Sequence, residues 1–238
     1  MDVRNFYSIE EQKVGFTREQ ASLFAKSVAG DFNPLHDVDT KRFCVPGDLL
    51  FAIALTELGV SQSMRFDFES MVTEKTVVSL PEKLTSKFSL LDQNDKPVMT
   101  IQSSGKNTKN VFFIASLIEQ YVQFSGRTFP EILIDLMKKN NVMINPSRPL
   151  IIYKDMVIEI DQFPEGSVEL EFSGASMTVD GKKGNVKLGF DLFVEGRVIG
   201  HGTKDMVVSG LRPYEQSAID KIVDEYNATK ATYQLSAN

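Results

Sequence analysis

The segment from Asp48 to Leu58 constrains the fold most, because it is apolar on nearly every side. Gly59 follows it directly, and glycine commonly ends a helix. A helix without a polar face belongs in the interior, since at a surface it would expose apolar side chains whichever way it turned. The sequence therefore predicts a helix over 48–58 that the rest of the chain encloses.

Segments typical of strands follow this helix. Four ranges carry the residue types and boundaries of strands, namely 64–68, 74–80, 84–91 and 98–104. Turn residues lie between or after them, at 92–97 and at Gly105. The predicted fold class is therefore α+β, with an antiparallel sheet wrapped around a central helix.

The second half of the chain repeats this order of elements. Helices are predicted over 111–124 and over 129–140, the latter with Pro130 in its first turn. Four further strands and a terminal helix are predicted over 150–160, 168–178, 185–194, 197–209 and 214–227. A boundary in the polar stretch 106–110 suits this repetition. We therefore predict two units of the same design, 1–109 and 110–238.

Composition is that of an ordinary soluble protein. Hydrophobic residues make up 42% and charged residues 24% of the 238 residues. No apolar run approaches the ~20 residues that span a bilayer, and the first residues do not resemble a secretory signal. The net charge of −6 argues against a nucleic-acid partner. Cys44, the single cysteine, forms no internal disulfide, and we predict a cytoplasmic protein that does not bind membranes.

An acid, an amide and an imidazole lie close together just after a predicted amphipathic helix over 17–28. They are Asp31, Asn33 and His36, and Pro34 stiffens the turn between them. Histidine titrates near neutral pH, so a neighbouring aspartate makes the two a natural proton-transfer pair. The same residues also suit an ordinary turn, in which Asp and Asn side chains accept backbone hydrogen bonds and Pro fixes the backbone.

The string Gly-Asp-x-Asn-Pro-Leu-His over 30–36 resembles the signature of the MaoC-like, R-specific (type 2) enoyl-CoA hydratases, which have the hot-dog fold. The resemblance implies two hot-dog units in one chain. It also implies syn hydration of a trans-2-enoyl thioester to a 3-hydroxyacyl thioester, without a metal or redox cofactor. The partner would be an acyl-CoA or an acyl-carrier-protein thioester.

The resemblance also assigns roles to residues. Asp31 would activate water, His36 would share the proton transfer and Asn33 would hold the loop. The backbone N–H of Gly47, at the start of the buried helix, would stabilise the thioester oxygen. Substrate-binding residues would be Pro34 and two basic residues that are placed to meet CoA phosphates, Lys41 and Arg42.

The chain departs from the family pattern around this motif. Arg42 stands where the family has a small residue, Pro46 replaces a histidine, and the loop 37–46 is short. Asp48 would oppose negative charge in an oxyanion hole unless it only stabilises the helix dipole. These departures keep open a non-catalytic protein that binds acyl thioesters, and Asp48 also keeps a thioesterase open.

The second unit lacks the motif, since no Asp-x-Asn-Pro-x-His string follows residue 110. The resemblance therefore implies a degenerate second unit. Monomer and homodimer both stay open, with the dimer preferred. Cys44 is expected to be a small buried thiol, and His201 is expected to be structural or exposed.

Overall fold

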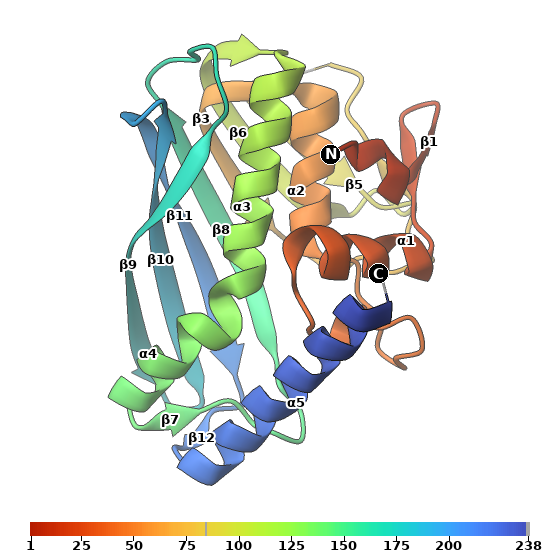
Figure 1. Ribbon diagram of the computed structural model, residues 1–238. Coiled ribbons are helices and arrows are strands. Elements are labelled where there is room, and N and C mark those ends of the chain that lie inside the picture. The colour runs from red at the N-terminus through yellow and green to blue at the C-terminus, as the bar shows by residue number, and fades with distance from the viewer. Residues whose placement is uncertain (84, 237–238) are drawn as a thin grey trace.

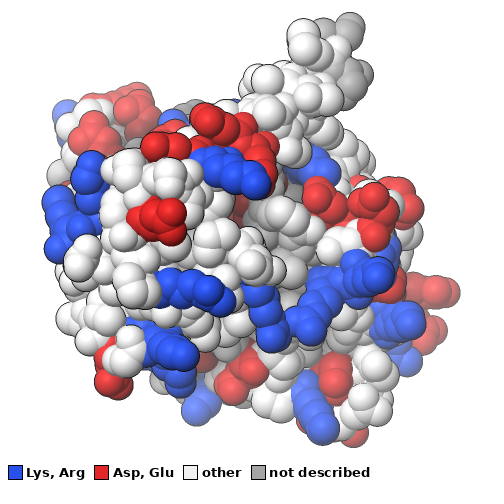
Figure 2. Space-filling view, turned by 90° about the horizontal axis from the view of Figure 1, so that it is seen from below, with Lys and Arg blue, Asp and Glu red and all other residues white. Residues whose placement is uncertain are grey.

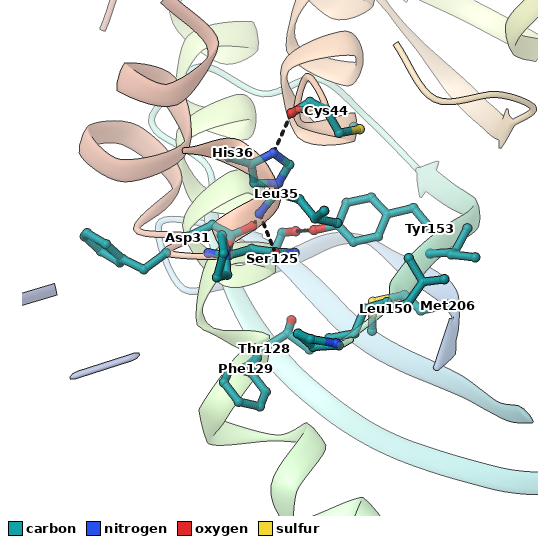
Figure 3. A pocket seen from close by; sticks show the side chains of 18 of the residues that line it. Asp31, Leu35, His36, Cys44, Ser125, Thr128, Phe129, Leu150, Tyr153 and Met206 are labelled. Carbon is teal, nitrogen blue, oxygen red and sulfur yellow. Dashed lines mark hydrogen bonds and ion pairs between the residues drawn. The ribbon is translucent and has the colours of Figure 1, made fainter. Parts of the chain in front are cut away.

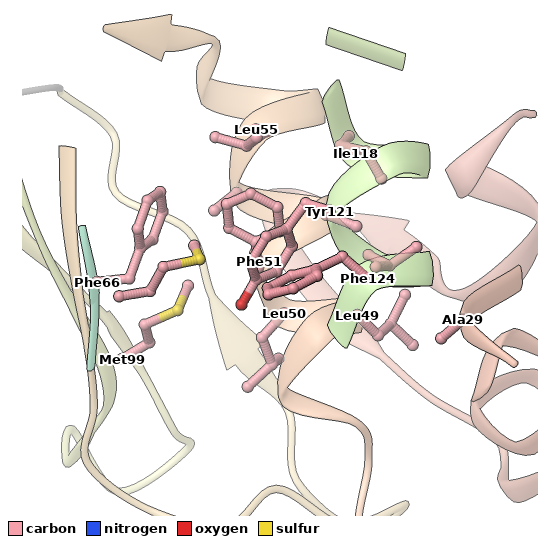
Figure 4. Close-up of a cluster of buried hydrophobic side chains, with 14 of the residues drawn as sticks. Ala29, Leu49, Leu50, Phe51, Leu55, Phe66, Met99, Ile118, Tyr121 and Phe124 are labelled. Carbon is pink, nitrogen blue, oxygen red and sulfur yellow. The ribbon is translucent and has the colours of Figure 1, made fainter. Parts of the chain in front are cut away.

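In a computed structural model, which describes residues 1–83 and 85–236, helix α2 (Gly47–Leu58) lies in the centre of the molecule. Its residues from Asp48 to Leu55 are all buried. The ring of Phe51 lies 5.1 Å from that of Phe66 and 4.5 Å from that of Tyr121, between centroids, as Figure 4 shows. The prediction of an enclosed helix over 48–58 is therefore confirmed.

The remaining chain forms strands, with helices at the start, the middle and the end. The strands are β1 (Ser8–Glu10), β2 (Lys13–Gly15), β3 (Val60–Phe68), β4 (Val78–Ser79), β5 (Lys87–Leu91), β6 (Pro97–Thr108), β7 (Val142–Met143), β8 (Ile151–Ile160), β9 (Glu169–Asp180), β10 (Lys183–Val194), β11 (Arg197–Ser209) and β12 (Arg212–Pro213). The other α-helices are α1 (Arg18–Leu23), α3 (Val111–Glu131), α4 (Leu133–Lys139) and α5 (Gln216–Ser236). Short 3-10 turns are η1 (Val3–Phe6) and η3 (Pro34–His36), and η2 (Phe24–Ala29) is a π-helical turn.

Ten strands form one antiparallel sheet in the order β1-β2-β4-β5-β6-β3-β8-β11-β10-β9. Helices α2 and α3 lie side by side across the sheet, and α5 crosses below them (Figure 1). The sheet thus curves around a helix whose residues 48–55 are all buried. The α+β class with a large antiparallel sheet and a central helix is confirmed.

The two sides of the sheet have matching strand orders, counted outward from its centre. Strands β3 and β8 pair at the centre, then β6 and β11, β5 and β10, and β4 and β9 follow on the two sides. A long helix precedes each set along the chain, α2 before the first and α3 before the second. The end of β6 and the start of α3 lie on either side of residues 109–110.

Several predicted boundaries are wrong. The strand predicted over 74–80 is reduced to β4, because hydrogen bonds between Thr73 and Thr76 close a turn there. Leu84, the predicted start of the next strand, lies outside the described residues, and β5 begins at Lys87. The helix predicted over 111–124 runs on as α3 to Glu131. A break at Phe129 precedes Pro130, which the sequence placed at the start of the next helix.

Helices α1 and η2 deliver the chain to the predicted motif. Thr17 caps α1 in a capping box with Gln20, as the sequence predicts. Gly30 ends η2 with a positive φ of 67°, a conformation that glycine adopts without strain. The next turn packs directly on α3, where Gly126 leaves room for the backbone of Ala29.

This close approach predicts a stability defect. A Cβ at position 126 would overlap the carbonyl oxygen of Ala29, which is backbone and yields little. We expect Gly126→Ala to lower the free energy of unfolding by about 1–3 kcal/mol, measured by urea denaturation. Arg127→Ala, an exposed position next to it in α3, is the control and should stay within about 0.5 kcal/mol of wild type. Equal stabilities of the two variants would contradict the close contact.

Candidate active site

The turn after η2 holds Asp31 in place through its backbone and one carboxylate oxygen. The N–H of Asp31 donates to the carbonyl of Ala25 at 2.8 Å. Oδ1 of Asp31 accepts from the N–H of Asn33 at 2.9 Å, and Oδ1 of Asn33 accepts from the N–H of Leu35 at 3.1 Å. Asn33 therefore caps η3 and fixes the loop. The second oxygen of Asp31 is left to face His36.

The imidazole of His36 is oriented by a backbone carbonyl. Its Nδ1 donates to the oxygen of Cys44 at 2.7 Å, so Nε2 points to the other side of the ring. There it lies 3.6 Å from Oδ2 of Asp31. That distance is too long for a direct hydrogen bond. Both atoms are nevertheless within reach of one water molecule placed beside them.

Charge around His36 favours its protonated form. Burial opposes that form, but the carboxylate of Asp31, the carbonyl of Cys44 and the charge of Asp48 together outweigh burial and raise the pKa of His36 above its ordinary value of 6.5. The protein therefore favours the imidazolium form of His36 more than water does. Burial alone lowers the pKa of an imidazole but raises that of a thiol, because it disfavours the charged form of each. It raises the pKa of Cys44 to about 11. Cys44 is thus a protonated thiol and not a nucleophile.

Asp31 and His36 lie at one end of a cavity of about 620 Å³ (Figure 3). Asn33, Pro34 and Gly47 also line it. Most of the remaining wall is apolar and comes from both halves of the chain, including Leu50, Phe68, Val72, Phe129, Leu133, Ile144, Leu150, Met206 and Ile222. A polar end joined to an apolar chamber suits a molecule with a reactive group on a hydrocarbon chain.

The predicted basic residues lie outside the cavity wall. Lys41 and Arg42 are exposed in the short loop that leads to Cys44, and among the described residues they are not part of the lining. Arg18 fastens this loop, because its guanidinium donates to the carbonyls of Val38 and Thr40, both at 2.9 Å. The shortened loop is therefore a fixed part of the fold. His201 is exposed on β11, as one of the two sequence interpretations has it.

A second polar group borders the same end of the cavity. Ser125 of α3 and Tyr153 of β8 line the wall, with 2.9 Å between their oxygens. Oδ2 of Asp48 accepts from Ser125 at 2.5 Å and from Tyr153 at 3.2 Å. Lys204 of β11 donates to Ser125 and lies 3.4 Å from the centre of the Tyr153 ring. The acid, the base and two hydroxyls thus form one buried network.

Burial shifts the two charged groups of this network toward neutrality. It lowers the pKa of Lys204 to about 8, against the attraction of Asp48 and Asp31. It raises the pKa of Asp48, although Lys204 and the hydroxyl of Ser125 oppose the rise. Burial and the nearby carboxylates also raise the pKa of Tyr153 well above its ordinary value, so the phenol stays protonated.

Sequence analysis missed Ser125, Tyr153 and Lys204. The sequence held a weak signal for Lys204. Side chains alternate between the two faces of a strand, so Lys204 of β11 points to the same face as three residues that are all buried: Gly202, Met206 and Val208. That alternation places a lysine in the core. Within the described residues, no group of three or more His, Cys, Asp or Glu side chains is placed to hold a metal ion.

Comparison with known proteins identifies the family. Residues 1–217 match the family described as "Protein of unknown function (DUF3581)". The chain belongs to the DUF3581 family. No curated protein matches the sequence of this DUF3581 member. Within the part of the chain that the structure describes, no helix is both long and apolar enough to cross a membrane.

Solved structures resemble this DUF3581 protein at low identity. An acyl-CoA thioesterase II from Mycobacterium marinum is 8% identical with a TM-score of 0.39, over 91% of this chain and 99% of its own. A conserved hot dog fold protein of unknown function from Alicyclobacillus acidocaldarius is 11% identical with a TM-score of 0.48, over 89% and 98%. A MaoC-like dehydratase is 9% identical with a TM-score of 0.42, over 87% and 99%. Function has to be argued from the residues of this chain.

The Asp31–His36 contact predicts a titration. Because the folded-state pKa of His36 is raised, its protonation stabilises the fold below pH 6.5, and this stabilisation is lost as the pH rises through the raised value. Asp31→Asn removes the attraction between the carboxylate and the imidazolium but leaves His36 buried. We therefore expect the pKa of His36 to fall, and NMR of the imidazole measures it. Asp39→Asn, an exposed change in the neighbouring loop, should leave the titration unmoved. A His36 pKa that is equal in both variants would refute the coupling.

The buried network predicts a loss of stability. Lys204→Met leaves the buried carboxylate of Asp48 without a counter-charge, which costs about 3–5 kcal/mol of unfolding free energy. We expect Lys204→Met with Asp48→Asn to recover part of this loss in denaturant titrations. Lys187→Met, at an exposed lysine on β10, is the control and should change stability by less than about 1 kcal/mol. A single Lys204→Met variant as stable as this control would contradict the account.

Proposed function

We propose that the chain is a double hot-dog protein of the MaoC-like type, with units 1–109 and 110–238. The mirrored strand order around β3 and β8 supports this proposal, as does the long helix that precedes each set of strands. The second unit carries no copy of the motif. It supplies walls to the cavity through α3, β8 and β11 instead.

We propose further that the protein hydrates trans-2-enoyl thioesters to 3-hydroxyacyl thioesters. One observation carries this proposal: Asp31 and His36 meet 3.6 Å apart in a cavity whose wall is mostly apolar. A water molecule that contacts both groups from the side can lose a proton to one of them while the other delivers a proton to the substrate. The enclosing apolar wall would hold the acyl chain.

The reaction needs two proton transfers on one face of the double bond. Asp31 takes a proton from the water as its oxygen bonds to carbon 3 of the enoyl group. The imidazolium of His36 gives a proton to carbon 2, and the proton on Asp31 then restores His36. The product gains one water, as hydration requires.

The thioester oxygen gains charge during this step and needs a donor. Gly47 supplies the first N–H of α2, one of the helix-start amides that have no partner within the helix. Asp48 does not line the cavity among the described residues, and the charge of Lys204 offsets its own. The opposition expected between Asp48 and an oxyanion is thereby reduced.

The carrier of the acyl group would be CoA or an acyl-carrier protein. Figure 2 shows the lower end of the molecule, where Lys and Arg side chains form a band across a chain of net negative charge. Helix α5, which lines the cavity, lies at this end (Figure 1). Lys41, Arg42 and Pro34 are the further proposed contacts of the carrier. A basic surface of this kind suits the phosphate groups of a carrier.

Hydration of crotonyl-CoA tests the proposal. We expect wild type to remove the absorbance of the conjugated double bond. Asp31→Asn and His36→Gln should each lower kcat/KM by about 10²- to 10⁴-fold, the usual contribution of a general acid or base. Asp39→Asn, an exposed aspartate of the same loop, should match wild type.

Two results would overturn hydration. One is a wild-type protein without turnover, which together with measurable acyl-CoA binding would favour the non-catalytic binding protein. The other is equal turnover by Asp31→Asn and the Asp39→Asn control.

A further inference from the structure

Ser125 lies between an acid and a base in a way that a stabilising ion pair does not require. Nζ of Lys204 is 3.7 Å from Oδ1 of Asp48, too far for a hydrogen bond, yet the same amine contacts Oγ of Ser125. Oδ1 of Asp48 is buried and has no hydrogen-bond partner. A pair kept only for stability would close directly. The hydroxyl placed between the two charges therefore needs another explanation.

The hydrogen bonds of Ser125 fix the orientation of its hydroxyl. A serine has one proton to donate and two lone pairs that accept. The proton of Ser125 points to Oδ2 of Asp48 at 2.5 Å, one lone pair accepts from Lys204, and the other faces the hydroxyl of Tyr153 at 2.9 Å. The carboxylate can take the proton, and the ammonium stabilises the oxygen that loses it. These are the two requirements for activating a serine as a nucleophile.

The network places the serine at the cavity wall and the two charges behind it. Ser125 lines the cavity, although it is only 3% exposed, whereas Asp48 and Lys204 do not line it and are 2% and 1% exposed. Figure 3 shows Ser125 between Asp31 and Tyr153 at the polar end of the cavity. A thioester held there would meet the serine oxygen and the Asp31–His36 pair from neighbouring positions.

We propose that Ser125 is a nucleophile that accepts the acyl group of an acyl thioester, with Asp48 as its general base and Lys204 as the charge beside it, so that the cavity also hydrolyses acyl thioesters. Burial supports the role of Asp48, because its raised pKa makes it a stronger base than an exposed aspartate. The N–H of Gly47 is the donor for the tetrahedral oxyanion in this step as well.

The first half of the reaction transfers the acyl group. The proton of Ser125 passes to Asp48, the serine oxygen bonds to the carbonyl carbon, and the carbon–sulfur bond breaks. The leaving thiolate takes the proton from Asp48. The products are an acyl-serine ester and a free thiol.

The second half releases the acid and depends on the proposed role of Asp31 and His36 in activating water. Water gives a proton to this pair as its oxygen bonds to the ester carbon, and the bond to Ser125 breaks. The pair passes that proton on to the serine oxygen, which restores both groups, and a carboxylic acid leaves. The sum is thioester plus water to acid plus thiol.

Octanoyl-CoA, which has no double bond to hydrate, is the probe for this reaction. We expect wild type to release thiol, followed with a thiol reagent, and to carry an octanoyl adduct on Ser125 in mass spectra of the quenched protein. Asp31→Asn should slow the second half more than the first, so the adduct should accumulate several-fold. Ser125→Ala should lower thiol release by about 10³-fold or more.

Ser116→Ala is the matched control, since Ser116 is a half-buried serine of the same helix outside the cavity wall. It should release thiol at the wild-type rate, and thermal melting checks that both serine variants fold. No adduct in wild type and Asp31→Asn, or equal thiol release by Ser125→Ala and Ser116→Ala, overturns the nucleophile. An adduct on Ser125 without hydration of crotonyl-CoA would uphold Ser125 and refute the hydration proposal.

Discussion

The burial of α2 is the constraint on which the rest of the structure depends. Its apolar surface has to be covered on every side, and a curved sheet with α3 alongside achieves this. Phe51 contacts both coverings, through Phe66 on the sheet and Tyr121 on α3. The helix therefore has its polar start, at Gly47 and Asp48, deep inside the molecule, where helix-start amides and an acid are valuable for chemistry.

An acid at that depth needs compensation, and the compensation comes from the other half of the chain. Lys204 of β11 and Ser125 of α3 reach Asp48 from elements far away in sequence. Asp31 and His36 stand on the opposite side of the same polar end, close enough that the carboxylates affect the pKa values of Lys204 and His36. The cavity thus has one electrostatic environment built from two distant parts of the chain.

Local patterns predicted what local contacts decide. The capping box at Thr17, the motif loop and the enclosed helix all depend on residues a few positions apart, and the sequence located each of them. The network around Ser125 depends on packing between α2, α3 and β11, and residue spacing within the sequence does not indicate which distant elements will pack together. The strand predicted over 74–80 failed because threonine hydroxyls closed a turn where alternation favoured extension.

Tyr226 gives the contact between α3 and the motif loop a wider meaning. Its hydroxyl, on α5, donates to the carbonyl of Gly30 at 3.1 Å, next to the point where Gly126 admits the backbone of Ala29. The loop that carries Asp31 is thus shaped by a helix from each of two later segments. A longer side chain at Gly126 or a shift of α5 would therefore move the loop that carries Asp31, so the position of this acid depends on packing far from the motif.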